Sequence, residues 1–282
     1  MRKPYEAMVA AALEEDIAFE DITTNATVDS DARCMVRLIA KQDGVLSGIK
    51  PFHAAFAQMD AEIEDWSAVA DGTRFRKGDV LVSFKGNTRA VLTAERTAIN
   101  FIQHLSGVAT LTAAYVAEVA GLDCRICDTR KTMPLLRQMQ KSAVVHGGGA
   151  NHRHTLMDAI LIKDNHIEAA GGIASAVRKA RRNAHHLLRI EVEVTNLEQF
   201  EEAIAAGADV IMLDNMDPDT MREAVRRRGD RPVILEASGN ARLESLRGMA
   251  ETGVDFISVG ALTHSAPSID LSLLIEALED HA

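Results

Sequence analysis

Short apolar runs and amphipathic segments alternate along the second half of the chain, and this alternation is the strongest constraint on its fold. The apolar runs have the character of buried strands and lie at 125–127, 159–162, 188–194, 210–213, 233–235 and 256–259. Segments with helical periodicity lie at 173–182, 197–206, 218–228 and 242–251. This succession predicts parallel strands joined by right-handed crossovers, in either a doubly wound sheet or a barrel.

Polar residues stand at the ends of the apolar runs. They are Asp128, Lys163, Glu193, Asp214, Glu236 together with Ser238, and Gly260. The carboxyl ends of parallel strands are where α/β folds place their chemistry, and a ring of strands points all of these ends at one mouth. Polar groups after six consecutive strands therefore favour an α/β barrel.

The segment from Asp128 to His166 is cationic, although the protein as a whole is acidic. It has six Lys and Arg against three Asp and Glu, whereas the rest of the chain has 25 against 38. The net charge of −10 disfavours binding to nucleic acid or to an anionic membrane. We expect a local pocket for a small, multiply charged anion.

Composition and cysteine content indicate an ordinary cytoplasmic protein. Of the 282 residues, 47% are hydrophobic and 26% are charged, as in soluble globular domains. No apolar run is long enough to span a membrane or to form the core of a signal peptide. The three cysteines, Cys34, Cys124 and Cys127, are too few for a disulfide framework.

The first hundred residues follow a different pattern, which predicts a small α+β domain. Helices are expected from Pro4 and from Pro51, and strands at 34–40, 63–69, 73–75 and 80–84, separated by glycine turns. A helix over 90–105 should be separated from the next one by Ser106-Gly107. A last helix over 269–278 would cover the start of the barrel or return to the first domain.

Two motifs have ordinary structural interpretations beside functional ones. Cys124 and Cys127 could suggest a redox or zinc site, but strand positions i and i+3 face opposite sides, so we interpret them as ordinary strand cysteines. The run HGGG at 146–149 resembles a lipase oxyanion-hole segment, but the chain has no Gly-x-Ser-x-Gly nucleophile elbow. These glycines form either a loop that approaches an anion or a tight connection.

The motif His152-Arg153-His154 allows a metal-hydrolase interpretation. In that alternative the two histidines bind a metal, and Lys163 and Asp214 complete the site. A guanidinium between two metal ligands would bring repulsion to the centre of the site, so the motif favours anion binding instead.

Cations, carboxylates and glycine turns together predict a site for two substrates. Arginine forks bind carboxylates bidentately, so Arg130 and Arg153, with Lys131 and Lys163, suggest a ligand with several carboxylates or phosphates. The carboxylates Glu193 and Asp214 suit Mg²⁺ bound through substrate phosphates. The turns SGN at 238–240 and GA at 260–261 follow the last two strands, where barrels hold phosphate on backbone amides.

Long ordered motifs resemble the carboxylating nicotinate-nucleotide pyrophosphorylase family, also called quinolinate phosphoribosyltransferase. The similarity runs from about Asp16 to the C-terminus. The motifs are ERTAINF at 95–101, DTRKT at 128–132, GGGANHR at 147–153, LIKDNH at 161–166, EVEV at 191–194, MLDNM at 212–216, EASG at 236–239 and SVGALTHS at 258–265.

The resemblance implies a fold, a reaction and an assembly. The expected fold is an N-terminal α/β sandwich domain over residues 1–106, an incomplete α/β barrel of the type II phosphoribosyltransferase kind over 107–265, and a C-terminal helix over 266–282 that returns to the first domain. The expected reaction joins quinolinate and phosphoribosyl pyrophosphate with Mg²⁺ to give nicotinate mononucleotide, pyrophosphate and CO₂ in NAD biosynthesis. The family also implies a homodimer, with a higher oligomer as an alternative, in which Arg96 enters the partner's site.

Site residues carry over from the family position by position. Arg96, Arg130, His152, Arg153 and Lys163 correspond to the quinolinate cradle. Lys131, Glu193 and Asp214 correspond to the pyrophosphate, ribose and metal side, and among these residues Lys131, Lys163, Glu193 and Asp214 are the expected catalytic group. Further substrate contacts are expected from Thr129, Ser238, Gly239, Asn240, Val259, Gly260, Ala261 and His264.

The chain departs from the family pattern at a few positions. Met133-Pro134-Leu135 stands where the family often has Thr-Pro-Gly, Ser142 where an aromatic residue is usual, and Asn240 where glycine is common. Two alternatives to the enzyme are a molybdate-transport-associated relative and a non-catalytic anion-binding barrel. The intact segments 151–153 and 163–166 argue against the first.

Overall fold

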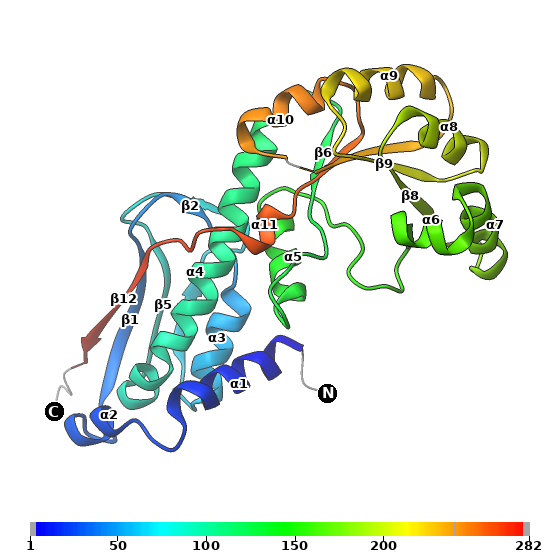
Figure 1. Cartoon of the computed structure of the whole chain (residues 1–282). Helices are drawn as coiled ribbons and strands as arrows, with labels where there is room; N and C mark the ends of the chain where they lie inside the picture. Colours follow the sequence, from blue (N-terminus) through cyan, green and yellow to red (C-terminus); the bar gives the residue numbers. More distant parts are fainter. Residues whose placement is uncertain (1–3, 240, 279–282) are drawn as a thin grey trace. The chain divides into compact units, whose positions relative to one another are not determined.

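The computed structural model describes residues 4–239 and 241–278, which form two compact units (Figure 1). The first unit contains residues 1–113, 133–148 and 265–282, and the second contains 114–132 and 149–264.

An antiparallel sheet in the order β12-β1-β5-β3 is the frame of the first unit, and β2 and β4 form a second, two-stranded sheet. The strands are β1 (Arg33–Ala40), β2 (Gly44–Val45), β3 (Glu64–Ala68), β4 (Arg74–Phe75), β5 (Val80–Asn87) and β12 (Leu271–Ala277). The helices are α1 (Pro4–Ile17), α2 (Ile22–Thr27), α3 (Ile49–Gln58), α5 (Arg137–His146) and most of α4 (Thr88–Glu118).

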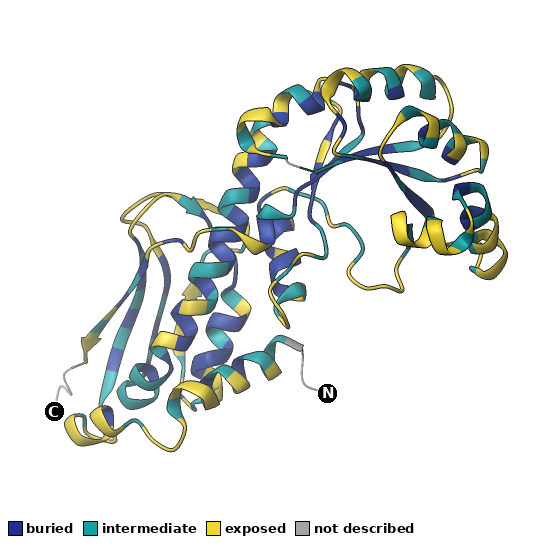
Figure 2. Ribbon diagram, viewed as in Figure 1, coloured by how far each residue is buried: buried dark blue, intermediate teal, exposed yellow. Residues whose placement is uncertain are grey.

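The hydrophobic core of the first unit lies between this sheet and helices α3 and α4. Alternate residues of β1 are buried, as expected for a strand with one face toward a core. Phe56 joins the layers, because its ring centroid is 5.1 Å from that of Phe52 on α3 and 5.0 Å from that of Phe84 on β5. Figure 2 shows the buried faces of these strands and helices in dark blue.

Helix α4 runs without interruption through Ser106 and Gly107, so the expected break at these residues is wrong. The two small residues permit close packing instead. A Cβ at Gly107 would lie 2.0 Å from the carbonyl oxygen of Pro267. The Ser106 hydroxyl accepts a hydrogen bond from the Ser47 backbone N–H and donates one to the Ser47 carbonyl, each at 3.1 Å.

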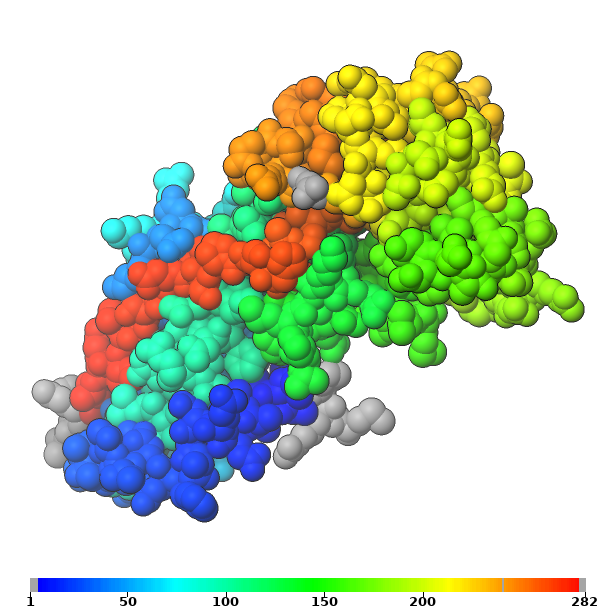
Figure 3. All heavy atoms as spheres, in the orientation of Figure 1, coloured from blue at the N-terminus to red at the C-terminus, as the bar shows by residue number. Residues whose placement is uncertain are grey.

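The C-terminal segment is a strand, so the predicted helix over this segment is wrong. Strand β12 pairs antiparallel with β1, from Leu271 opposite Ala40 to Ala277 opposite Cys34. The preceding residues follow α4 (Figure 3), where the Ile269 N–H donates to the Gln103 carbonyl at 3.1 Å and Gln103 Nε2 donates to the Leu271 carbonyl at 2.9 Å. The pairing partner overrides the helical propensity of this leucine-rich segment.

Six parallel strands form the sheet of the second unit in the order β6-β11-β10-β9-β8-β7. The strands are β6 (Arg125–Cys127), β7 (Ile160–Ile162), β8 (Ile190–Val194), β9 (Val210–Asp214), β10 (Ile234–Ser238) and β11 (Phe256–Ser258). The helices after β7 are α6 (Asp164–Ala170), α7 (Ile173–Asn183), α8 (Leu197–Ala205), α9 (Pro218–Arg228), α10 (Leu243–Ala250) and α11 (Ala261–His264).

This strand order is that of a barrel with one gap. Each strand from β7 to β10 pairs with the next one along the chain, and β11 pairs with β6, so β6 and β7 are the two ends of the ring. Ala150 forms a parallel bridge with Cys127 of β6. The structure confirms the expected incomplete α/β barrel with an N-terminal sandwich domain.

Local sequence explains where the barrel helices begin. Asp217 caps α9 by accepting hydrogen bonds from the backbone N–H groups of Asp219 and Thr220, and Pro218 occupies the first turn. Asn196 caps α8 through Gln199 in the same way. None of the helices in the described ranges is both long and apolar enough to cross a membrane.

Candidate active site at the carboxyl ends of the barrel strands

A cavity of about 570 Å³ lies at the carboxyl ends of the barrel strands. Most of its lining comes from residues that the sequence analysis selected. These are Thr129, Arg130, Lys131, His152, Arg153, Lys163, Glu193, Asp214, Ser238 and Gly239. Residues from six segments that are distant in sequence therefore meet around one cavity in the second unit.

Other predicted site residues lie after β11, next to Lys131. A Cβ at Gly260 would lie 3.1 Å from Lys131 Cδ and 3.2 Å from His264 Nε2, so glycine keeps this approach open. Val259 is buried behind this turn, and Ala261 begins the short helix α11. Arg96 is an exposed residue of α4 in the first unit, and Asn240 lies outside the described residues.

Lys163 and Glu193 form an ion pair at the mouth of the cavity. Lys163 Nζ lies 2.8 Å from Glu193 Oε2, and the Lys163 side chain is 48% exposed. Lys163 also precedes α6, and its backbone N–H donates to His166 Nδ1 at 3.0 Å. The lysine is thus fixed at its backbone while its ammonium group remains accessible to a ligand.

Asp128 is a buried anchor and lies beneath the mouth. One carboxylate oxygen accepts a hydrogen bond from Asn151 Nδ2 at 2.6 Å, and the other accepts one from the His152 backbone N–H at 2.9 Å. Together with the bridge at Ala150, these bonds fix the segment that carries His152 and Arg153. Asp128 therefore positions the cationic residues.

His152, Glu191 and Glu236 form a cluster inside the barrel, and two of its members, His152 and Glu236, also line the cavity. His152 Nδ1 accepts a hydrogen bond from the Arg153 backbone N–H at 2.8 Å, and this assigns the ring proton to Nε2. Nε2 lies 3.0 Å from Glu191 Oε2 and 3.8 Å from Glu236 Oε2. Among the described residues, Oε1 of Glu191 and Oε1 of Glu236 are buried without a hydrogen-bond partner.

The pKa of Glu236 is raised to about 7, chiefly because burial disfavours the carboxylate and next because the Glu191 carboxylate lies close by. The nearby Asp128 acts in the same direction, whereas His152 and a hydrogen bond from Ser258 partly offset the shift. Burial and the neighbouring Glu191 carboxylate therefore favour the protonated form of Glu236.

Arg153 connects the cluster with the cavity. Its Nη1 donates a hydrogen bond to the Ala159 carbonyl at 3.0 Å. Burial and the neighbouring Arg130 lower the pKa of the guanidinium, although an arginine remains charged at neutral pH. Two guanidinium groups close enough to disfavour each other's charge gain from an anion bound between them.

Two groups of side chains could hold a metal ion. The ligand atoms of His152, Glu191 and Glu236 lie within 4.8 Å of one another. The predicted pair Glu193 and Asp214 lines the cavity and presents hard oxygen ligands, as Mg²⁺ prefers. The metal-hydrolase alternative paired His152 with His154, but His154 is exposed and the potential ligands beside His152 are Glu191 and Glu236.

Different contacts require a glycine in the HGGG run and in the EASG motif. A Cβ at Gly147 would lie 2.4 Å from the Ala109 carbonyl oxygen, so in the first unit this glycine permits a tight connection. Gly239, at the cavity, has φ of +90°, and a Cβ there would lie 2.2 Å from Asn215 Oδ1. Of the two interpretations left open for the HGGG run, the tight connection holds for Gly147.

Leu135 is one of the departures from the family pattern, and its backbone conformation can be compared with that of the usual glycine. Its φ is +65°, in the left-handed region that favours glycine, and its side chain is exposed. The family's usual glycine at this position matches that backbone conformation. The leucine retains the turn at the expense of some strain.

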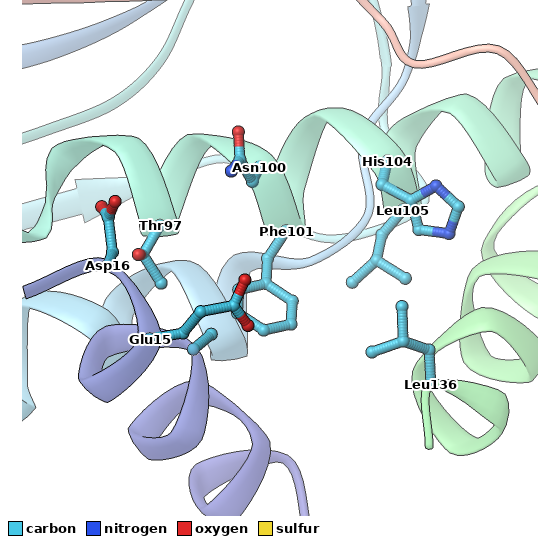
Figure 4. A pocket seen from close by; sticks show the side chains of 9 residues that line it. Glu15, Asp16, Thr97, Asn100, Phe101, His104, Leu105 and Leu136 are labelled. Carbon is cyan, nitrogen blue, oxygen red and sulfur yellow. The ribbon is translucent and has the colours of Figure 1, made fainter. Parts of the chain in front are cut away.

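A separate cavity of about 280 Å³ lies in the first unit (Figure 4). Its polar lining includes Glu15 and Asp16 from α1 and Asn100 and His104 from α4. Burial lowers the pKa of His104, which favours the neutral ring. Two carboxylates and a neutral histidine do not suit an anion, so this cavity does not match the predicted substrates.

Glu191 was not among the residues predicted for the site, although it lies in the cluster with His152 and Glu236. The signal was present in Glu191-Val192-Glu193, because alternate residues of a strand face the same side. If Glu193 points into the barrel, Glu191 must do so one layer deeper.

The parallel strands, the gap in the ring and the cavity at the carboxyl ends define an α/β-barrel protein whose cavity is lined by several cationic side chains. A model of the N-terminal domain of quinolinate phosphoribosyl transferase matches residues 21–106, and a model of its C-terminal domain matches residues 108–274. The chain belongs to the quinolinate phosphoribosyl transferase family.

Relatives with the same architecture cover nearly the whole chain. A Bacillus subtilis (strain 168) protein named probable nicotinate-nucleotide pyrophosphorylase (carboxylating) is 44% identical over 259 residues, which are 92% of this chain and 89% of that protein. The nicotinate-nucleotide pyrophosphorylase (carboxylating) of Mycobacterium leprae is 41% identical over 94% of this chain and 95% of its own length. The crystal structure of NadC from Streptococcus pyogenes superposes with a TM-score of 0.93 at 41% identity and covers 99% of each chain.

Proposed function

We propose that this protein is a quinolinate phosphoribosyltransferase of de novo NAD biosynthesis. It converts quinolinate and phosphoribosyl pyrophosphate to nicotinate mononucleotide, pyrophosphate and CO₂. The observation that carries the proposal is the single cavity in which Arg130, Lys131, Arg153 and Lys163 meet Glu193 and Asp214. We place this reaction in the cytoplasm, where its small charged substrates are dissolved.

The cations on one side of the cavity hold quinolinate. Arg130 and Arg153 bind its two carboxylates, since guanidinium forks match carboxylates bidentately. Lys163 adds a point charge that can leave Glu193 for the ligand, because the Lys163 side chain is half exposed. His152 also lines the cavity, and its two ring nitrogens are held by the Arg153 backbone N–H and by Glu191.

The opposite side holds phosphoribosyl pyrophosphate. Lys131 faces the pyrophosphate, and Glu193 and Asp214 bind Mg²⁺ through the substrate phosphates. If Mg²⁺ is held there, it would supply positive charge that offsets the charge developing on the departing pyrophosphate. The backbone amides after β10 and β11, around Ser238-Gly239 and Gly260-Ala261, hold the 5′-phosphate.

Positioning and charge complementarity supply most of the catalysis. The pyridine nitrogen attacks the ribose carbon while pyrophosphate leaves, and the carboxylates of Glu193 and Asp214 stabilise positive charge that develops on the ribose. Loss of CO₂ then leaves an electron pair on C2 of the ring, next to the quaternary nitrogen. The substrate provides its own electron sink, so the protein needs chiefly to orient it.

Purified protein given quinolinate, phosphoribosyl pyrophosphate and Mg²⁺ is expected to release CO₂ and nicotinate mononucleotide in equal amounts. Nicotinate in place of quinolinate should give neither product. Binding of quinolinate without product would favour the non-catalytic anion-binding barrel, and failure to bind either substrate would also remove the phosphoribosyltransferase assignment. An EDTA-treated sample tests the requirement for Mg²⁺.

The proposed enzyme is a homodimer in which Arg96 completes the partner's cradle. Arg96→Ala and Lys163→Ala proteins should each be inactive, and subunit mixing should restore activity, because hybrid dimers contain one intact site. Mixtures of Lys163→Ala with Asp214→Ala are the control. Both of these changes affect the same chain's cavity, so no intact site can form. Equal behaviour of the two mixtures, with hybrids verified, would contradict a shared site.

A further inference from the structure

Asn215 directly follows β9 and was not among the residues predicted for the site, yet it lines the 570 Å³ cavity. Its φ is +53°, in the left-handed region that is strained for residues other than glycine. Asparagine tolerates this conformation better than most residues do, because its short polar side chain can hydrogen-bond locally. Of the non-glycine residues with positive φ in the described ranges, Asn215 alone lines this cavity. Such strain persists where the surrounding contacts hold it.

Two hydrogen bonds hold Asn215 at the ends of β9 and β10. Its backbone N–H donates to the Ser238 carbonyl at 2.9 Å, next to the last residue pair of these strands, Asp214 and Ser238. Its side-chain Nδ2 donates to Asp214 Oδ2 at 2.9 Å. A carboxylate only accepts hydrogen bonds, so this partner assigns the amide nitrogen of Asn215 to the Asp214 side. Oδ2 of Asp214 is thereby fixed, and Oδ1 of Asp214 is left for a ligand.

The amide oxygen of Asn215 packs against Gly239. A Cβ at Gly239 would lie 2.2 Å from Asn215 Oδ1 and 2.6 Å from Asn215 Cγ, and φ of Gly239 is +90°. Glycine at this position therefore makes room for the asparagine side chain. The turns after β9 and β10 fit together through this contact, and both of them border the cavity.

We propose that Asn215 is a positioning residue that fixes the two sides of the phosphoribosyl pyrophosphate site relative to each other. Its amide nitrogen orients the Asp214 carboxylate, and its amide oxygen supports the turn at Gly239 that holds the 5′-phosphate. This role rests on the proposed function and deepens it. Quinolinate binds to the cations on the other side of the cavity, so its affinity does not depend on Asn215.

Asn215→Asp tests the amide donor with almost no change in shape. Aspartate also tolerates left-handed backbone, but its carboxylate repels that of Asp214 and cannot donate to it. The Kd of phosphoribosyl pyrophosphate, measured by isothermal titration calorimetry with Mg²⁺, and its KM should rise roughly 10- to 100-fold, the range for lost partners of ligating carboxylates. The Kd of quinolinate should remain that of the wild type. Wild-type affinity for phosphoribosyl pyrophosphate overturns the proposal, and so does an equal loss for both substrates.

Asn215→Gly separates the side chain from the backbone and covers the case in which Asn215→Asp does not fold. The urea midpoint should stay close to that of the wild type, because relief of backbone strain offsets the greater entropy of glycine in the unfolded chain. Affinity for phosphoribosyl pyrophosphate should still fall by a similar factor. Wild-type affinity in this variant overturns the proposal. A lower midpoint together with equal losses for both substrates also overturns it, since Asn215 would then only maintain the fold.

Ala18→Gly is the matched control for the backbone change. Ala18 has the same φ of +53° at an exposed position after α1, so this variant should bind both substrates like the wild type. The wild-type protein separates two kinds of failure. If it releases CO₂ and the Asn215 variants keep their affinity, only the role of Asn215 is refuted. If it neither binds phosphoribosyl pyrophosphate nor releases CO₂, the proposed function is refuted, and this role with it.

Discussion

Glu191 and Glu193 are two residues apart on β8 and face the same side of the sheet, yet their surroundings differ. Glu193, at the mouth, is paired with Lys163 at 2.8 Å. Glu191, one layer deeper, is buried with Glu236, and each has a carboxylate oxygen without a hydrogen-bond partner among the described residues. Charges at the mouth are thus compensated and accessible, whereas charges in the interior are incompletely compensated and shielded from water.

The difference means that two electrostatic environments lie within one barrel. An exposed ion pair contributes little to stability and can exchange its partner for a ligand. A buried carboxyl destabilises the protein when it is charged, and this same penalty raises its pKa into the range useful for acid catalysis. The interior carboxylates should therefore affect stability and its pH dependence, and the mouth residues should affect substrate binding.

The largest expected effect is a pH-dependent stabilisation by Glu236→Gln. Burial raises the pKa of Glu236 to about 7 from an ordinary 4.5, so the unfolded chain loses this proton at lower pH than the folded one. Wild-type stability should fall as pH rises from 4.5 to 7, by up to about 3 kcal/mol, and then level off. Urea unfolding at pH 5 and pH 8 measures this. The free energy of unfolding of Glu236→Gln, relative to that of the wild type, should be larger at pH 8 than at pH 5.

Glu223→Gln is the control for this measurement. Hydrogen bonds from Arg226 and Arg227 lower the pKa of Glu223 to about 2, so its contribution is lost only as pH falls below 4.5. Its difference from the wild type should be the same at pH 5 and pH 8. If Glu236→Gln behaved in this way as well, Glu236 would be charged throughout the range, and the contrast between mouth and interior would fail.

The mouth could be predicted from sequence better than the interior. Lys163, Glu193 and Asp214 follow apolar runs directly, so strand order alone brings them to one end of a barrel. Glu236 was assigned to the same mouth, but it lies two residues before the end of β10, and depth within a barrel depends on register between strands. Glu191 was missed because an acidic residue inside a strand is normally expected to face solvent.

The C-terminal segment shows that prediction of the fold from sequence has the same limit. Leu271, Leu273 and Ile275 alternate as in a strand, but leucine, alanine and glutamate also favour a helix. The deciding fact is a vacant edge on β1, more than 200 positions away in the chain, and local periodicity cannot reveal it. The helix break predicted at Ser106-Gly107 was wrong for a similar reason. Gly107 permits close packing against the Pro267 carbonyl and does not end the helix.

The next effect in size is on quinolinate binding at the mouth. Arg130→Ala should raise the KM for quinolinate by the equivalent of a lost charged hydrogen bond, about 1.5 to 3 kcal/mol, or roughly 10- to 150-fold. Arg153→Ala should act in the same direction. The KM for phosphoribosyl pyrophosphate should change far less, and steady-state kinetics with each substrate varied in turn measures both. Equal changes in the two KM values would contradict the proposed division of the cavity.

The smallest expected effect is on stability, from Lys163→Ala. The Lys163 side chain is 48% exposed and that of Glu193 15%, so loss of this partly exposed pair should lower the free energy of unfolding by less than about 1 kcal/mol. Arg181→Ala removes another partly exposed pair, with Asp209, and is the matched control. Urea unfolding should give similar small losses for both variants, whereas only Lys163→Ala should lose CO₂ release. A loss of several kcal/mol in Lys163→Ala alone would mean that Lys163 compensates the interior carboxylates as well, and mouth and interior would then form one electrostatic unit.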